Sequence, residues 1–169
     1  SIGLIKKTGN PRFVYDSFRR LLMMYADVVM EKSNQKVNIN NSGIRIQLDK
    51  ILEKVKDKNG CKNDGDLNAE TLKILCQTFQ KQIMKIFNQP FPEDPIEQLW
   101  KSINAVFKSW NGKRALDYRN IEHIPHAWGT AVNVQSMVFG NMGNHSATGV
   151  AFTRNPSTGQ KKIFGEWLK

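Results

Sequence analysis

Residues 130–139 read TAVNVQSMVF, and side chains of two kinds alternate along this stretch with a period of two. Val132, Val134 and Val138 fall on one side of the alternation, and β-branched residues at alternate positions favour a strand. Before Trp128 the apolar residues instead recur at spacings of three and four, which is typical of helices. The change of period predicts an α+β protein with its helices first and its strands after them.

The sequence after this stretch predicts further strands joined by turns. We expect residues 148–153 to form a returning strand, paired with 130–139 in a hairpin across the Gly- and Asn-rich loop 140–146. Residues 155–159, NPSTG, predict a turn, because Asn, Pro and Gly favour turn conformations. Another strand begins within 161–168, where the sequence ends without a closing element. We therefore expect a piece of a longer protein.

Three amphipathic helices are predicted before residue 90. Asn10 is a favourable N-cap, Pro11 suits the first helical position, and Asn68 starts the third helix. Polar residues at 31–42 and 57–66 predict loops between the helices. The three apolar faces consist of Val14, Phe18, Leu21, Leu22, Tyr25 and Val29; of Ile44, Leu48, Ile51, Leu52 and Val55; and of Leu72, Leu75, Cys76, Phe79, Ile83, Ile86 and Phe87.

Three prolines within residues 89–95 predict a boundary, because proline lacks an N–H and restricts the residue before it. We expect a helical subdomain over 1–90 and a second subdomain over 91–169. A fourth helix follows the boundary, and a short helix is expected at 113–119. The expected buried side of the fourth helix consists of Ile96, Leu99, Trp100, Ile103, Val106, Phe107 and Trp110.

The 169 residues carry 25 basic and 15 acidic side chains, a formal net charge of +10. The excess is spread evenly, and no basic stripe with interleaved aromatic residues accompanies it. We therefore expect a solvated basic surface rather than a nucleic-acid partner. No apolar run is long enough to cross a bilayer, so no membrane partner is expected either.

Short motifs supply no catalytic or metal-ligating residue. Cys61 and Cys76 lie far apart without a CxxC pattern, which favours a reducing, cytoplasmic setting over a disulfide or zinc site. The three histidines, His123, His126 and His145, are expected on exposed loops without ligand partners at metal-binding spacing. Residues 63–66, NDGD, lack the register of a calcium loop and predict a polar turn.

Glycines in residues 140–149 allow two interpretations. Glycine lets backbone N–H groups approach a phosphate closely, and Ser or Thr hydroxyls add donors. A glycine-rich hairpin tip can equally be only a turn, and no Gly-Lys-Ser/Thr follows as in a Walker motif.

Longer stretches of this sequence closely resemble the pyruvate phosphate dikinase family. The similarity also includes Asp66-Leu67 before a helix and Lys113-Arg114-Ala115 before the strands, and it is weakest in the polar loops of the helical half. The most similar stretches are Gly9–Phe13, Tyr15–Arg20, Trp128–Asn141, Ser146–Gly159 and Gly165–Glu166.

The resemblance implies a middle part of an ATP-grasp-like nucleotide-binding domain, namely the helical insert and the start of the second lobe. In this family that domain phosphorylates a histidine on a swivelling domain, which carries the phosphoryl group to a pyruvate-binding barrel domain. ATP, phosphate and pyruvate are thereby converted to AMP, diphosphate and phosphoenolpyruvate with Mg²⁺. The resemblance also implies a homodimeric parent protein.

The resemblance assigns six residues to nucleotide binding. It implies that Gln135, Met137 and Val138 line the adenine pocket and that Thr148 and Gly149 approach the phosphates. Arg19 is implied to neutralise phosphate charge from the helical insert. For Met137 and Val138 a buried strand is an alternative, and for Arg19 a surface charge.

The family's remaining phosphate and magnesium ligands lie outside these residues by resemblance, so we expect the chain alone to be inactive and to hold no cofactor tightly. None of the three histidines or two cysteines takes the family's phosphohistidine or pyruvate-site role. Two alternatives stay open. One is phosphoenolpyruvate synthase or another ATP-grasp dikinase, which differs in its phosphate acceptor. The other is a basic nucleic-acid-binding module.

Overall fold

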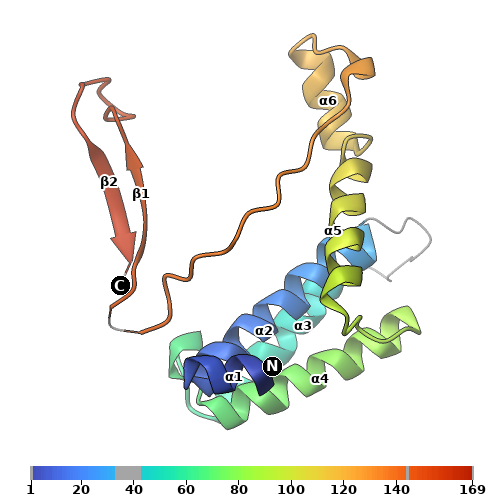
Figure 1. Ribbon diagram of the computed structural model, residues 1–169, viewed down its shortest axis with the longest axis vertical. Helices are drawn as coiled ribbons and strands as arrows, with labels where there is room; N and C mark the ends of the chain where they lie inside the picture. Colours follow the sequence, from blue (N-terminus) through green and yellow to red (C-terminus); the bar gives the residue numbers. More distant parts are fainter. Residues whose placement is uncertain (1, 33–42, 144, 169) are drawn as a thin grey trace. The chain divides into compact units, whose positions relative to one another are not determined.

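The computed structural model describes residues 2–32, 43–143 and 145–168. Its contacts divide the chain into two units, Ser1–Asn133 and Val134–Lys169. Figure 1 shows the helices of the first unit and the strands of the second. The elements are α1 (Ile2–Thr8), α2 (Pro11–Tyr25), η1 (Ala26–Lys32), α3 (Ile44–Lys58), η2 (Asp64–Asp66), α4 (Ala69–Phe87), α5 (Pro95–Ser109), α6 (Lys113–Ile121), η3 (His126–Trp128), β1 (Thr148–Phe152) and β2 (Phe164–Leu168).

Helices α2, α3 and α4 confirm the three predicted amphipathic helices. Asn10 Oδ1 accepts a hydrogen bond of 2.9 Å from the N–H of Phe13, and Pro11 takes the first helical position. Asn68 Oδ1 caps α4 in the same way. The predicted faces meet in one core, whose fully buried side chains include Leu22, Ile44, Leu48, Leu67, Leu72, Leu75, Phe79 and Ile83.

The first polar loop begins later than the sequence predicted. Glu31 and Lys32 continue the helix as the end of η1, a π-helical extension of α2, and residues 33–42 of the predicted loop lie outside the described residues. The Glu31 carboxylate accepts a hydrogen bond of 2.7 Å from the N–H of Ile44. Gly43, the N-cap of α3, has no side chain to cap the helix. Glu31 therefore satisfies a backbone donor that the N-cap residue leaves free.

Helix α5 confirms the fourth predicted helix, but its expected buried side is wrong. Trp100 is 61% exposed, and the other six residues named for that side are exposed or only half-buried. Within the described residues only Ala105 of α5 is buried. The helical spacing of apolar residues predicts a face, but burial of the face requires a neighbouring element to cover it.

Phe91, between the prolines of residues 89–95, belongs to the helical core although the sequence analysis placed it in a boundary. Its ring makes edge-to-face contacts with Phe18 and Tyr25, at centroid distances of 6.1 and 5.2 Å. The proline-rich segment therefore packs on the bundle. The proposed division into 1–90 and 91–169 stays a prediction.

The strand predicted at 130–139 is wrong, and so is its hairpin with 148–153. Residues 130–139 are irregular, while β1 pairs antiparallel with β2, from Thr148 opposite Leu168 to Phe152 opposite Phe164. A strand needs a partner strand to take its backbone hydrogen bonds, and the sheet formed by the described residues consists of β1 and β2. The predicted turn at 155–159 is confirmed, because Asn155 Oδ1 accepts hydrogen bonds from the N–H groups of Ser157 and Thr158.

The described residues are therefore mostly helical with a two-stranded antiparallel sheet, which is consistent with the predicted α+β class. The ATP-grasp-like lobe stays a prediction. Among the described helices, none combines the length and apolar character that crossing a membrane requires.

The core makes a simple prediction for stability. Leu75 on α4 is fully buried, whereas its neighbour Ile74 is 54% exposed. We expect L75A to lower the free energy of unfolding of the chain by about 2–5 kcal/mol, because truncation leaves a cavity. The matched control I74A is expected to cost less than about 1 kcal/mol. Urea unfolding followed by circular dichroism measures both, and equal losses would contradict the described core.

Candidate functional site

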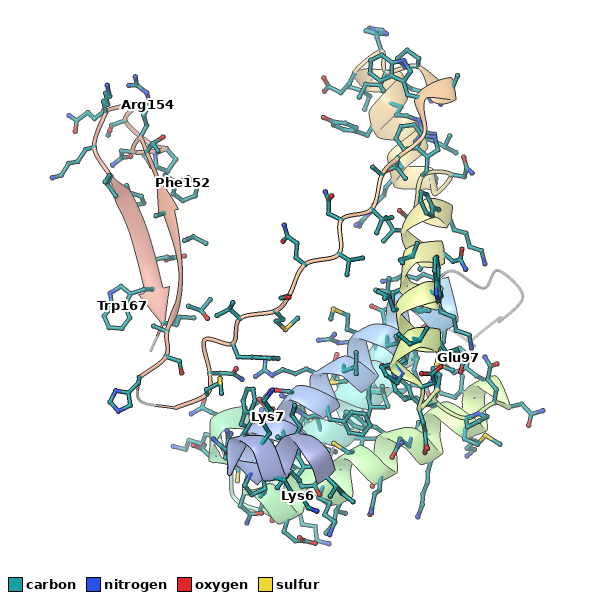
Figure 2. The ribbon with its side chains drawn as sticks, in the orientation of Figure 1. Lys6, Lys7, Glu97, Phe152, Arg154 and Trp167 are labelled. Carbon is teal, nitrogen blue, oxygen red and sulfur yellow. The ribbon has the colours of Figure 1, made fainter. Side chains whose placement is uncertain are left out.

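Thr148 and Gly149, the two residues assigned to the phosphates, open strand β1. Figure 2 labels Phe152, the last residue of β1, and Trp167 of β2. Gly149 faces Trp167 across the sheet. A Cβ added at Gly149 would lie 2.7 Å from the carbonyl oxygen of Glu166 and 3.0 Å from Cβ of Trp167. The absence of a side chain at this position is therefore required by strand pairing.

The glycine-rich loop folds back onto the start of β1. A Cβ added at Gly140 would overlap the Thr148 hydroxyl, and it would lie 2.7 Å from the carbonyl oxygen of Ala147. Ser146 Oγ donates to the carbonyl of Gly143 and accepts from its N–H, at 2.9 and 3.0 Å. The loop thus brings several backbone groups and two hydroxyls to one end of the hairpin.

The three residues assigned to the adenine pocket lie on the irregular segment. Gln135, Met137 and Val138 are all exposed, and Val138 has 94% of its surface accessible. In the described part of their unit these three residues form no regular strand, and no other element buries them. Their role in nucleotide binding stays a prediction, as does that of Thr148 and Gly149.

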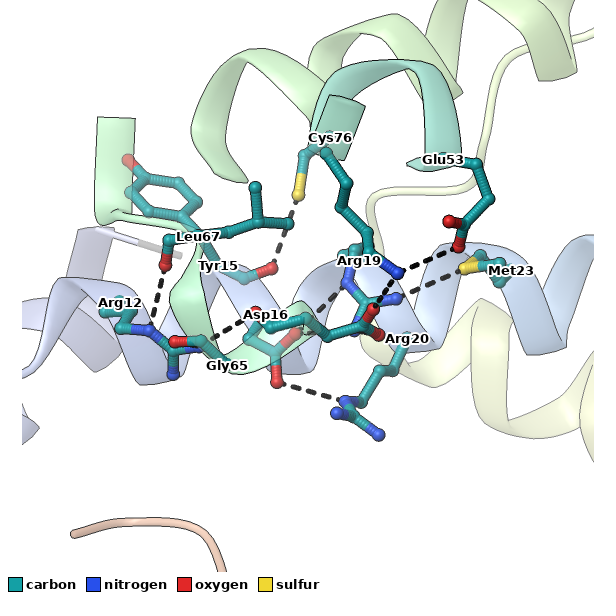
Figure 3. Close-up of polar contacts among 12 residues, drawn as sticks. Arg12, Tyr15, Asp16, Arg19, Arg20, Met23, Glu53, Gly65, Leu67 and Cys76 are labelled. Atoms are coloured by element: carbon teal, nitrogen blue, oxygen red, sulfur yellow. Dashed lines mark hydrogen bonds and ion pairs between the residues drawn. The ribbon is translucent and has the colours of Figure 1, made fainter. Parts of the chain in front are cut away.

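Arg19 belongs to the other unit and is 3% exposed on α2. Its guanidinium donates to Asp16 Oδ1 at 2.6 Å (Figure 3). It also donates to Asp64 Oδ2 at 3.1 Å. Asp64 also lies 3.5 Å from Lys56 Nζ of α3. The guanidinium is thus neutralised within the helical unit, and its predicted contact with phosphate stays untested.

A second arginine of α2, Arg12, fixes the turn between α3 and α4 to α2. Arg12 donates from Nε to the carbonyl of Leu67 at 2.9 Å and from Nη2 to those of Gly65 and Asp64 at 2.8 and 3.1 Å. One guanidinium therefore donates to three carbonyls of the same turn. Residues 63–66 form the polar turn that the sequence predicted, whereas no sequence pattern indicated this role for Arg12.

Burial alone would raise the pKa of Asp16, but hydrogen bonds and charges from Arg19 and Arg20 outweigh it and hold that pKa below the usual range. Asp16 accepts from Arg20 Nε at 3.0 Å on its second oxygen. Both carboxylate oxygens are therefore satisfied. The carboxylate is held in its charged form and is no candidate for a general acid.

The cysteines offer no nucleophile of low pKa. Burial raises the pKa of the Cys76 thiol to about 12, and its Sγ donates to the carbonyl of Tyr15 at 3.4 Å. Cys61 and Cys76 are both free, so they form no disulfide with each other. Over the described ranges 2–32, 43–143 and 145–168, no group of three His, Cys, Asp or Glu side chains could hold a metal ion.

A second buried arginine, which the sequence analysis missed, joins the ends of α5 and α6. Arg119 is 2% exposed, and its guanidinium carbon lies 3.8 Å from the centroid of the Trp110 ring. Arg119 Nε donates to Nδ1 of His126 at 3.1 Å. No spacing rule could have indicated this cluster, because turns separate all three residues.

The comparisons with known proteins agree with the resemblance. A family model described as "Pyruvate phosphate dikinase, AMP/ATP-binding domain" matches residues 79–167. Pyruvate, phosphate dikinase of Clostridium symbiosum is 49% identical over 167 residues, which are 98% of this chain and 18% of the relative. That of Rhizobium meliloti (strain 1021) is 46% identical over 160 residues, 95% of this chain and 17% of the relative. The chloroplastic pyruvate, phosphate dikinase 1 of Arabidopsis thaliana is 48% identical over 167 residues, 99% of this chain and 16% of the relative.

The matched residues include β1, most of β2 and the segment between α6 and β1. These parts therefore belong to the class of AMP/ATP-binding domains that the family model describes. The match extends over more than half of the chain. The chain belongs to the pyruvate phosphate dikinase family. It spans 16–18% of the length of the three relatives described above.

The buried ion pair between Asp16 and Arg19 leads to a prediction about how the stability of the fold depends on pH. Because the pKa of Asp16 is lowered from its ordinary value of 3.8, its charge stabilises the fold above that pH, and the stabilisation is lost as pH falls through the folded pKa. At pH 7 we expect D16N to cost about 3 kcal/mol, because Arg19 loses its closest counter-charge. The variant should also lose less stability than the wild type between pH 4 and pH 2.

Urea unfolding at several pH values measures this dependence. The matched control is D49N, because Asp49 forms an exposed pair with Arg45 at 3.2 Å and is expected to contribute less than about 1 kcal/mol. Identical acid profiles for D16N and the wild type would show that Asp16 is not the titrating group.

The close contact at Gly149 makes a prediction for the hairpin. In G149A the new Cβ must displace the backbone of β2. We expect amide protection in β1 and β2 to fall about tenfold or more in hydrogen exchange, since overpacking costs about 1–3 kcal/mol. G3A is the control, because a Cβ at Gly3 meets no atom within 4 Å. Unchanged protection in G149A would contradict the pairing register.

Proposed function

We propose that the chain is part of the nucleotide-binding region of a pyruvate, phosphate dikinase. The proposed reaction converts ATP, phosphate and pyruvate to AMP, diphosphate and phosphoenolpyruvate through a phosphohistidine. The observation that carries the proposal is the match to the AMP/ATP-binding domain family over residues 79–167, joined to 46–49% identity with three dikinases. An ATP-grasp-like lobe is the fold that we propose for the second subdomain.

In this proposal the irregular segment and the hairpin bind different parts of the nucleotide. Gln135, Met137 and Val138 line the adenine, because apolar side chains beside one amide suit a planar base with polar edges. The Thr148 hydroxyl and the backbone N–H of Gly149 donate to phosphate oxygens. The exposure of all five residues in the described unit leaves them accessible to a ligand.

Arg19 takes part only under one condition. Its Asp16 contact is buried, whereas Asp64 is partly exposed. A phosphate oxygen would therefore have to replace the Asp64 carboxylate to reach the guanidinium. Without that exchange, Arg19 holds the helical subdomain together.

Phosphoryl transfer from ATP generally uses Mg²⁺ to neutralise developing phosphate charge. The described residues do not fit such a site, because no cluster of acidic ligands occurs among them. We therefore propose no metal ligand among these residues. Its own residues orient the base and donate hydrogen bonds to phosphate.

The proposed partners of this region are phosphate, the histidine-bearing and pyruvate-binding domains of the same parent chain, and a second copy in a homodimer. The proposed compartment is the cytoplasm. Free Cys61 and Cys76 are consistent with a reducing setting.

The test uses the full-length protein that contains these residues. We expect formation of AMP, diphosphate and phosphoenolpyruvate that requires ATP, pyruvate and inorganic phosphate together. Chain 1–169 alone should form none of them. Phosphoenolpyruvate formation without inorganic phosphate would instead favour phosphoenolpyruvate synthase, and absence of nucleotide turnover would overturn the proposal.

A variant of Thr148 tests whether the hairpin contributes to ATP binding in the full-length enzyme. T148V removes one hydroxyl donor to a charged phosphate, and we expect the KM for ATP to rise about tenfold. T78V is the matched control, because the Thr78 hydroxyl donates within α4 to the carbonyl of Ile74. Equal KM values for ATP in T148V and T78V would remove Thr148 from the site.

A further inference from the structure

Arg119 is the buried cation of α6, and its contacts differ from those of Arg19. No carboxylate of the described residues lies within ion-pair distance of its guanidinium. Its partners are the ring of Trp110, the carbonyl of Trp110 and Nδ1 of His126. A planar guanidinium can stack on a ring and donate in its own plane at the same time, which a lysine ammonium cannot do.

His126 is held at three points by this arrangement. Because Arg119 Nε can only donate, His126 Nδ1 accepts, and the neutral ring carries its proton on Nε2. That Nε2 lies 3.1 Å from Asn120 Oδ1, to which it donates. The His126 carbonyl accepts from the Trp110 indole N–H at 3.3 Å. Both the side chain and the backbone of His126 are therefore fixed to α5 and α6.

The anchored residue stands directly before the segment that carries the proposed adenine contacts. His126 opens η3, which ends at Trp128, and Gly129 follows with a φ of +76° that favours glycine. Gln135 comes six residues after Gly129. A segment this short reaches at most roughly 20 Å, so fixing its start restricts where Gln135 can lie.

We propose that Arg119 is a positioning residue for nucleotide binding, which anchors η3 and thereby the start of segment 129–139. The inference rests on the proposed function. Ordering an irregular segment around a ligand costs conformational entropy, and an anchored start lowers that cost. The anchoring should therefore affect binding of the nucleotide more than the chemistry of the other substrates.

The experiment uses the full-length enzyme with the variants R119M, R119K and H126A. For each variant we expect the KM for ATP to rise about tenfold, comparable with the entropy of ordering one residue. The KM for pyruvate should not change. The exchange of labelled pyruvate into phosphoenolpyruvate should also stay at the wild-type rate, because it needs no nucleotide. R119K should not rescue the wild-type KM.

R114M is the matched control, because Arg114 is an exposed arginine of the same helix. W110F keeps a ring beside Arg119 and removes only the indole donor, so it tests the anchor if R119M fails to fold. A smaller rise in the KM for ATP is expected for W110F. A wild-type KM for ATP in R119M, H126A and W110F, or an equal rise in the KM for pyruvate, would overturn the inference. A wild-type enzyme without ATP turnover would instead overturn the proposed function, and the inference with it.

Discussion

The helical unit depends on the neutralisation of one buried guanidinium. Arg19 projects from α2 into the core, where an unpaired charge is costly, and its two carboxylate partners come from α2 itself and from the turn before α4. Arg12 ties three carbonyls of that turn to the same helix. Because Asp64 and these three carbonyls meet Arg19 and Arg12 only when α2 and the turn pack together, the cluster selects one packing of α2 against the turn before α4. Apolar contacts then supply most of the stabilisation.

Two buried arginines act in different ways in this chain. Arg19 is paired with carboxylates and joins helices within the core. Arg119 has an aromatic ring, a carbonyl and a neutral imidazole as partners, and it joins α5, α6 and η3. The first arrangement fixes the helical bundle. The second fixes η3, which directly precedes segment 129–139, to α5 and α6.

Apolar surface on α5 and on the hairpin is uncovered within the described residues. Trp100 and Phe107 of α5 and Phe152 and Trp167 of the hairpin are all exposed. A two-stranded sheet alone is only marginally stable in water. The irregular segment 130–139 also exposes apolar side chains, among them Val134 and Val138. Its alternating valines suit a strand that pairs with neighbouring strands. These features agree with a chain that spans 16–18% of the length of its relatives.

The sequence by itself determined the helices, because caps such as Asn10 and Asn68 and the spacing of apolar residues act locally. It also determined the family, through long similar stretches. Only the tertiary structure decided the pairing of Arg19 with Asp64, the partners of Arg119 and the burial of Phe91. The candidate site was named by resemblance, and residues 130–139 did not form the predicted strand. Strand pairing and the neutralisation of buried charge join residues that are distant in sequence, so no local pattern specifies them.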